Sequence, residues 1–302
     1  MPIERRTRIW LGMGSWLLAG TSAVGLNAAG ASPLETGPGL RRDAPALQRL
    51  AQTQGGEKGG HSHGHGAAAA QGGEGGEGGE GGEAGALAGA SEHEAFIARL
   101  LLIRGHLAVG KELYDARRPD DALPHYMHPL EEIYGDLEPA FAERKKPGFK
   151  EELQALVDAV KARKPAAEIA EQQKALIGKV EATAAIIPAT ERQSAAFASR
   201  VAVYVLKVAN EEYEAAIENG KIANAVEYQD SRGFVAAGKA YLRRNEKALK
   251  AKDAQAYDAI VKAFTDLGKA YPGIMPPVQP KITAGEFQAA TSRIELQASR
   301  FH

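Results

Sequence analysis

The sequence contains no cysteine among its 302 residues. This absence excludes disulfide bonds, thiolate metal sites, iron–sulfur clusters and cysteine nucleophiles. An excess of charge of one sign is also lacking, because 37 lysines and arginines stand against 38 aspartates and glutamates. The formal net charge of −1 gives no general attraction to nucleic acid or to an anionic membrane. We therefore expect no nucleic-acid partner.

Glycine is scarce in the second part of the chain and abundant before it. Sixteen of the 34 glycines lie between Gly55 and Gly89, whereas 11 lie from Ser91 to the end. A segment so rich in glycine and so poor in apolar residues cannot offset the entropy lost on ordering. The composition predicts a disordered linker over residues 32–90 and a folded domain over residues 91–302, which is long enough for one buried core.

The first 31 residues have the three parts of a secretory signal. Arginines between Arg5 and Arg8 precede an apolar stretch over residues 9–26, and small residues follow at 28–32. The alternative is a single membrane anchor, but glycines interrupt the stretch and its length is marginal for the ~20 residues that a span needs. The pattern predicts a signal peptide over residues 1–31 and a periplasmic protein.

The glycine-rich linker contains a histidine tract made of His61, His63 and His65. In an extended chain, alternate side chains point to the same face. The three imidazoles can therefore converge on one ion such as Cu²⁺, Ni²⁺ or Zn²⁺. The alternative interpretation is a solvated spacer, because glycine makes this segment a flexible coil.

The remaining sequence has helical periodicity. Ser91 to Glu94 forms a capping box before apolar residues at helical spacing, and Thr190–Gln193 and Thr283–Glu286 show the same pattern. Gly220 is a typical residue to end a helix, and we recognise no strand–turn–strand signal. We expect an all-α fold, a helical bundle of about seven to eight helices. The helical patterns cover about 91–118, 123–144, 150–163, 165–186, 190–219, 221–250, 253–270 and 283–300.

Metal-binding side chains are concentrated in one short segment. Two histidines, two glutamates and two tyrosines lie between His125 and Tyr134. On a helix, His125, His128 and Glu132 would form one stripe, and His128 and Glu131 would be neighbours. Imidazole and carboxylate groups are common ligands of transition metals. The alternative is structural: the histidines are satisfied polar side chains, and carboxylates are favourable in the first turn of a helix.

Other helices carry polar side chains on stripes that face the core. Glu212 shares a stripe with valines, and Asp230, one turn after Glu227, shares a face with small and apolar residues. A carboxylate in such a place is costly unless it is paired or bound to a metal. The alternative is an ion pair of Asp230 or Glu227 with Arg232, Arg200 or Arg104. Inward Glu and His from facing helices, by contrast, build di-metal sites. The candidate metal ligands are His106, His125, His128, Glu131, Glu212, Glu227 and Asp230.

The segment from His128 to Gly135 resembles the His-x-x-Glu signature of the imelysin-like family. This family comprises exported helical-bundle proteins and includes EfeO-like periplasmic iron-uptake proteins. His128, Glu131 and Gly135 match the pattern, whereas Tyr126 and Met127 replace its usual glycine and aromatic residue. The resemblance implies metal binding, with His128 and Glu131 as ligands.

These patterns favour a metal-binding protein over an enzyme. No nucleotide-binding loop, nucleophile elbow or zinc-protease motif is present in the sequence. We expect an exported periplasmic protein that binds iron or copper, with zinc a further option, for uptake, storage or delivery. Its partner would be a membrane permease or another periplasmic metal-handling protein. The alternatives are a metal-dependent oxidoreductase that uses the same side chains, and a structural or interaction module.

Overall fold

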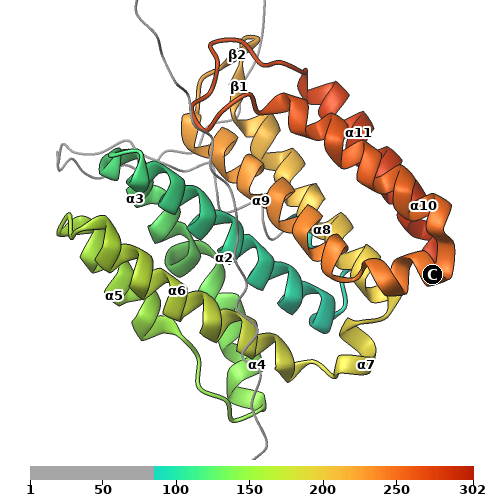
Figure 1. Ribbon diagram of the computed structural model, residues 1–302, viewed down its shortest axis with the longest axis horizontal. Coiled ribbons are helices and arrows are strands. Elements are labelled where there is room, and N and C mark those ends of the chain that lie inside the picture. The colour runs from blue at the N-terminus through green and yellow to red at the C-terminus, as the bar shows by residue number, and fades with distance from the viewer. Residues whose placement is uncertain (1–84) are drawn as a thin grey trace, which may run out of the picture. The chain divides into compact units, whose positions relative to one another are not determined.

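The computed structural model describes residues 85–302 (Figure 1). The predicted signal peptide, most of the predicted linker and the histidine tract lie outside these residues. The described part is all-α, as the periodicity predicts, apart from one two-stranded sheet. Its elements are α2 (Glu92–Asp115), α3 (Pro119–His128), the π-helix η1 (Pro129–Ile133), the 3₁₀-helix η2 (Tyr134–Leu137), α4 (Glu138–Glu143), α5 (Lys150–Lys161), α6 (Ala166–Thr183), η3 (Ala184–Ile186), α7 (Ala189–Arg192), α8 (Ala195–Ala215), β1 (Ile217–Glu218), β2 (Lys221–Ile222), α9 (Ala225–Arg244), α10 (Glu246–Leu267), η4 (Gly268–Ala270), α11 (Ala284–Ala298) and η5 (Ser299–Phe301).

The helices α8, α9, α10 and α11 pack against one another, and α2 packs on α8 and α9 (Figure 1). The other side of α2 contacts α3 and α6, so this helix joins the two groups. Each of these four helices buries a phenylalanine, namely Phe197, Phe234, Phe264 and Phe287, and the ring of Phe234 packs against α2 beside His106. Full burial of one such ring stabilises the fold by about 1.5–3 kcal/mol.

Two of the three predicted capping boxes are present. The hydroxyls of Ser91 and Thr283 accept from the backbone three residues later, and the glutamates at those positions complete both boxes. The third prediction was wrong, because Thr190 lies inside the four-residue helix α7. The cap of α8 is Ser194, whose hydroxyl accepts from the N–H of Phe197 at 3.2 Å.

Gly220 lies in a hairpin rather than at the end of a helix. Helix α8 ends at Ala215, and β1 then pairs antiparallel with β2. The turn consists of Asn219 and Gly220, which have φ angles of 51° and 74°. An Asn-Gly pair favours two consecutive residues with positive φ, which is what a two-residue hairpin turn requires. The short strands lack the alternating pattern that would have marked them in the sequence.

The breaks predicted between the helical patterns 221–250, 253–270 and 283–300 are both present in the structure. Helix α10 is interrupted at Asp253, whose φ of −157° and ψ of 98° are not helical. The Asp253 carboxylate accepts from the N–H of Ala256 at 2.9 Å, as a helix cap does. The segment 276–280 lies in the non-helical connection between η4 and α11, as its prolines predict.

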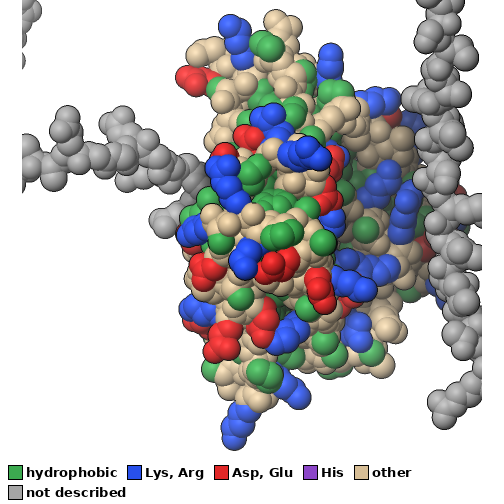
Figure 2. All heavy atoms as spheres, turned by 60° about the vertical axis from the view of Figure 1, so that its left-hand side comes forward, with side chains coloured by type: hydrophobic (Ala, Val, Ile, Leu, Met, Phe, Trp, Pro, Cys, Tyr) green, Lys and Arg blue, Asp and Glu red, His purple; other side chains and the backbone are tan. Residues whose placement is uncertain are grey.

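The folded unit begins before the predicted boundary at residue 91. Ala86 and Leu87 are each 6% exposed and belong to the hydrophobic core. Acidic and basic side chains are interspersed on the face shown in Figure 2, with small hydrophobic areas among them. None of the helices in residues 85–302 combines the length and apolar character that a membrane crossing requires.

Candidate metal centre

The loop between α2 and α3 turns the chain back on itself. Helix α2 ends at Asp115, and Arg117 takes a φ of 62° in this loop. Pro119 is the first residue of α3, where its missing N–H costs nothing. Helix α3 then packs along α2, which brings the segment with His125 and His128 against the part of α2 that contains His106.

The π-helical turn η1 continues α3 and contains the two glutamates that follow His128. Pro129 has no N–H and its ring crowds the preceding turn, and the N–H of Tyr134 bonds to the carbonyl of Pro129 five residues back. Such wide turns are frequent at functional sites. The Nδ1 of His128 lies 3.8 Å from the Oε2 of Glu132, and both glutamates of this turn, Glu131 and Glu132, are exposed. The rings of His125 and His128 have centroids 6.3 Å apart, so His125, His128 and Glu132 lie next to one another as their helical spacing predicts.

Helices α2 and α9 cross at two glycines. A Cβ atom on Gly233 would lie 2.6 Å from the carbonyl oxygen of Gly105, and one on Gly105 would lie 3.0 Å from the backbone of Gly233. Only residues without a side chain permit this approach. The crossing brings His106, the residue after Gly105, next to Asp230 on α9.

Three imidazoles surround the carboxylate of Asp230. Its Oδ1 lies 2.6 Å from Nδ1 of His106 and 2.7 Å from Nδ1 of His125. Its Oδ2 lies 3.2 Å from Nδ1 of His128. Asp230 and His106 are 1% exposed and His125 is fully buried. A carboxylate at this depth requires strong compensation, and the histidines provide it.

The second ring nitrogen of His125 faces another acceptor. Its Nε2 lies 2.9 Å from Oε1 of Gln229, and the Gln229 amide nitrogen donates to the carbonyl of Ile274 at 3.2 Å. The contact with Ile274 fixes the amide so that its oxygen points to His125. A neutral imidazole carries a single N–H. The close contact of its other nitrogen with Asp230 therefore requires a proton or another cation.

The electrostatics of the site follow from this geometry. Burial alone would raise the pKa of Asp230, but the charges and N–H groups of His106 and His125 outweigh burial and hold that pKa well below its usual range. Burial would lower the pKa of His128, but the hydrogen bond and charge of Asp230 raise it above the ordinary 6.5. The Asp230 carboxylate is thus negative at neutral pH and attracts positive charge.

Two overlapping groups of side chains have the spacing needed to hold a metal ion. The first is His106, His125 and Asp230, and the second is His106, His128 and Glu132. Within each group, the ligand atoms all lie within 4.8 Å of one another. His106 belongs to both groups, and Asp230 contacts His128 as well, so the five side chains form one connected centre.

Three of the predicted ligands lie outside both groups. Glu131 is exposed, Glu212 is buried on α8, and Glu227 accepts from the side chain of Asn224 at 3.2 Å. Gln229, which orients His125, was missed, because a glutamine beside an aspartate carries no ligand signal in a sequence. The arginines offered as partners of Asp230 pair elsewhere: Arg104 with Glu181, Arg200 with Glu94 and Arg232 with Glu112.

Comparison with known protein families gave a match to the C-terminal part of the chain. Residues 188–301 match the model of the iron permease-associated 4-helix bundle domain. This segment includes α8, α9, α10 and α11, the four helices that pack together. Comparison with curated proteins and with solved structures gave no significant match. Asp230 and Gln229 lie inside the matched segment, whereas the three histidines and Glu132 precede it.

Proposed function

We propose that this protein is an exported transition-metal carrier, which holds its ion at His106, His125 and Asp230. The observation that carries the proposal is the pair of acceptors around His125. Metal-bound histidines commonly donate their other N–H to a carbonyl oxygen, which fixes the free nitrogen toward the ion. Gln229 is placed to accept that N–H, and a cation between His125 and Asp230 would satisfy both groups.

The graded exposure of the five side chains supports a carrier role. Glu132 is 29% exposed at its side chain and His128 is 19% exposed, whereas His106 is 2% exposed. Since His106 belongs to both groups, an ion bound first at Glu132 and His128 can exchange ligands stepwise towards the interior. We propose that the second group is the entrance to the first.

Iron is the metal that the donor set and the family match favour together. Two histidines and one carboxylate are the ligands of many non-haem Fe(II) sites. The matched domain is described as associated with an iron permease. Copper and zinc also bind imidazole and carboxylate, so both belong in the binding measurements. An iron permease is the partner that we propose, for uptake or delivery.

The proposed location is the periplasm. If residues 1–31 are removed on export, the mature chain begins near Ser32 and lacks Trp10 and Trp16. N-terminal sequencing of the protein from a periplasmic extract should find this start. A mature product that still shows the fluorescence of both tryptophans would contradict export by a cleaved signal.

A metal-dependent oxidoreductase is the second candidate function, because the same two-histidine, one-carboxylate set occurs in Fe(II) oxygenases. We favour binding over catalysis, since the three side chains of the inner group are at most 2% exposed. Consumption of oxygen or peroxide by the iron-loaded protein at many turnovers per chain would establish the enzymatic alternative instead.

The decisive binding experiment compares two adjacent glutamates. It uses the full chain with His61, His63 and His65 replaced by alanine, so that only the core site is measured. Glu132→Gln should weaken Fe²⁺ binding by roughly 10-fold or more, because even substitutions of residues that only hydrogen-bond to metal ligands lower metal affinity by this much. Glu131→Gln should have no effect, because Glu131, although as exposed as Glu132, lies outside both groups. Isothermal titration calorimetry with Fe²⁺ under anaerobic conditions, and with Cu²⁺ and Zn²⁺, gives the affinities and the stoichiometry.

The reverse outcome, with Glu131→Gln impaired and Glu132→Gln normal, would support the ligand set implied by the imelysin-like resemblance. Absence of binding of all three metals in the parent chain would reject the proposed function altogether.

The affinity for the metal should depend on pH. A histidine must lose its proton to bind a metal, and the pKa of His128 is raised above 6.5 by Asp230. Protons therefore compete at a higher pH than they would at an ordinary imidazole, and the apparent affinity should fall as the pH is lowered towards 6. Titrations between pH 8.5 and 5.5 check this. His128→Gln should reduce the steepness of the fall, and an equal slope in both proteins would contradict the assignment.

A further inference from the structure

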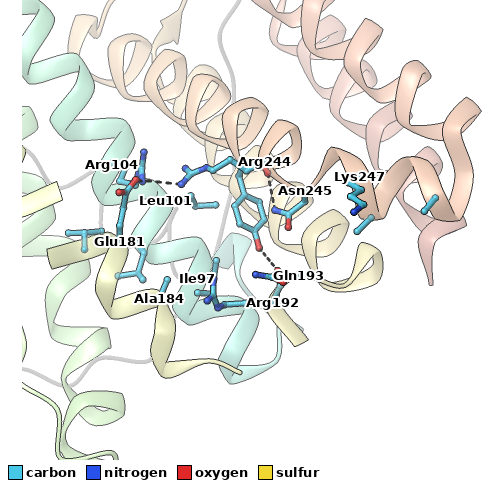
Figure 3. A pocket seen from close by; sticks show the side chains of 15 residues that line it. Ile97, Leu101, Arg104, Glu181, Ala184, Arg192, Gln193, Arg244, Asn245 and Lys247 are labelled. Atoms are coloured by element: carbon cyan, nitrogen blue, oxygen red, sulfur yellow. Dashed lines mark hydrogen bonds and ion pairs between the residues drawn. The ribbon is translucent and has the colours of Figure 1, made fainter. Parts of the chain in front are cut away.

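A separate pocket of about 640 Å³ lies between α2, α6, α9 and α10 (Figure 3). Its walls are largely apolar, with aliphatic side chains from α2 and α6 and alanines from α10. Pockets of 300–1,000 Å³ are typical of small-molecule sites. The apolar wall residues that matter here are Ile97, Leu101, Val180 and Ala248.

The charged side chains of this pocket are mostly basic. Four cationic residues line it, Arg104, Arg192, Arg244 and Lys247, against the single carboxylate of Glu181. This excess contrasts with the whole chain, which has a formal net charge of −1. A local surplus of positive charge next to apolar walls attracts an anion that also has an apolar part.

The arginines of the pocket are incompletely paired. Glu181 contacts both Arg104 and Arg244, with 3.5 Å between its Oε1 and Nη1 of Arg244. Burial, and then the nearby charge of Arg104, lower the pKa of Arg244, and the charge of Glu181 offsets them only in part. The Nε of Arg192 is buried and has no hydrogen-bond partner among the described residues.

We infer that this pocket binds an organic carboxylate with an apolar body, such as a medium-chain fatty acid. Arginine binds carboxylates through paired N–H groups in a geometry that lysine cannot reproduce. A carboxylate near Arg192 and Arg244 would supply the missing negative charge, while its chain would contact Leu101, Val180 and Ala248. This site is independent of the metal centre, and the inference does not rest on the proposed function.

The experiment measures binding to the full chain in EDTA, so that the metal centre plays no part. Three probes are titrated by calorimetry: decanoate, decanol and acetate. Decanoate should bind at least 10-fold more tightly than either of the others, because it alone has both the charge and the apolar chain. Equal binding of decanol and decanoate, or no measurable binding of decanoate, would overturn the inference.

Variants locate the binding. Arg192→Gln and Arg244→Gln should each weaken decanoate binding at least 5-fold, and Ala248→Phe should block it by filling the apolar end. Arg293→Gln is the matched control, since Arg293 is exposed on α11 and does not line the pocket. Circular dichroism confirms that each variant is folded. If decanoate binding is unchanged in the three folded pocket variants, the pocket is not the site.

Discussion

Replacing Asp230 with asparagine is expected to abolish metal binding at the core centre. Asp230 is the one carboxylate in the inner group and contacts all three histidines. Asparagine keeps the shape but removes the negative charge that a metal cation requires. Substitutions of residues that only hydrogen-bond to a metal ligand reduce metal affinity roughly 10–100-fold. Removal of a ligand itself should therefore reduce the affinity by more than about 100-fold. Calorimetric titration of both proteins with Fe²⁺ measures the difference.

The same substitution should destabilise the metal-free protein. The folded state holds the pKa of Asp230 well below its usual range through His106 and His125. Removal of one member of a buried charged cluster typically costs about 3–5 kcal/mol. Urea denaturation at pH 7 measures this loss. Metal should raise the urea midpoint of the parent protein by mass action and leave that of Asp230→Asn unchanged.

Asp136→Asn provides the control for Asp230→Asn. Asp136 pairs with Arg99 at the surface and its side chain is 52% exposed. Exposed ion pairs contribute about 0–1 kcal/mol, so this variant should resemble the parent in stability and in metal binding. If Asp230→Asn destabilises the fold while the parent protein binds no metal, the cluster is a purely structural network of buried charges.

Periodicity was sufficient to predict the local part of the site. His125, His128 and Glu132 share a face because α3 and the π-helical turn continue in one direction through Pro129. The motif resemblance pointed instead to Glu131, which belongs to neither group of metal-spaced side chains. A motif gives spacing along the chain, whereas the direction of a side chain depends on how each turn is wound.

The partner of Asp230 could not be predicted from the sequence. Its small, apolar stripe predicted burial, and burial is what the structure shows. The choice between arginine and histidine as partner depends on which helix lies opposite. The close contact between Gly105 and Gly233 places α2, and with it His106, opposite Asp230. These two glycines are 128 positions apart, so no local sequence pattern predicts their contact.

The site also crosses the boundary of the family match. The segment 188–301 supplies Asp230 and Gln229, while α2 and α3 supply the histidines. The four-helix bundle alone therefore contains only part of the proposed centre. The proposed centre can form only if α2 packs closely on α9. Substitution of a glycine at their crossing tests this requirement.

Gly233→Ala should separate α2 from α9 and disrupt the metal centre without changing any ligand. The new Cβ would lie 2.6 Å from the carbonyl oxygen of Gly105 and 2.9 Å from Cγ2 of Val109. The backbone oxygen cannot rotate away as a side chain can, so the helices must move apart. Overpacking of this kind costs about 1–3 kcal/mol. The displacement of Asp230 from His106 should weaken Fe²⁺ binding at least 10-fold.

Gly178→Ala is the matched control for Gly233→Ala, because the same methyl group is added inside helix α6 with no atom within 4 Å. Alanine there should stabilise the protein by about 0.5–1 kcal/mol, since glycine is the poorer helix former. The two variants should thus shift the urea midpoint in opposite directions, and only Gly233→Ala should lose metal affinity. If Gly233→Ala is destabilised but binds Fe²⁺ as the parent does, the ligands do not depend on the α2–α9 crossing, and the proposed assembly of the centre is wrong.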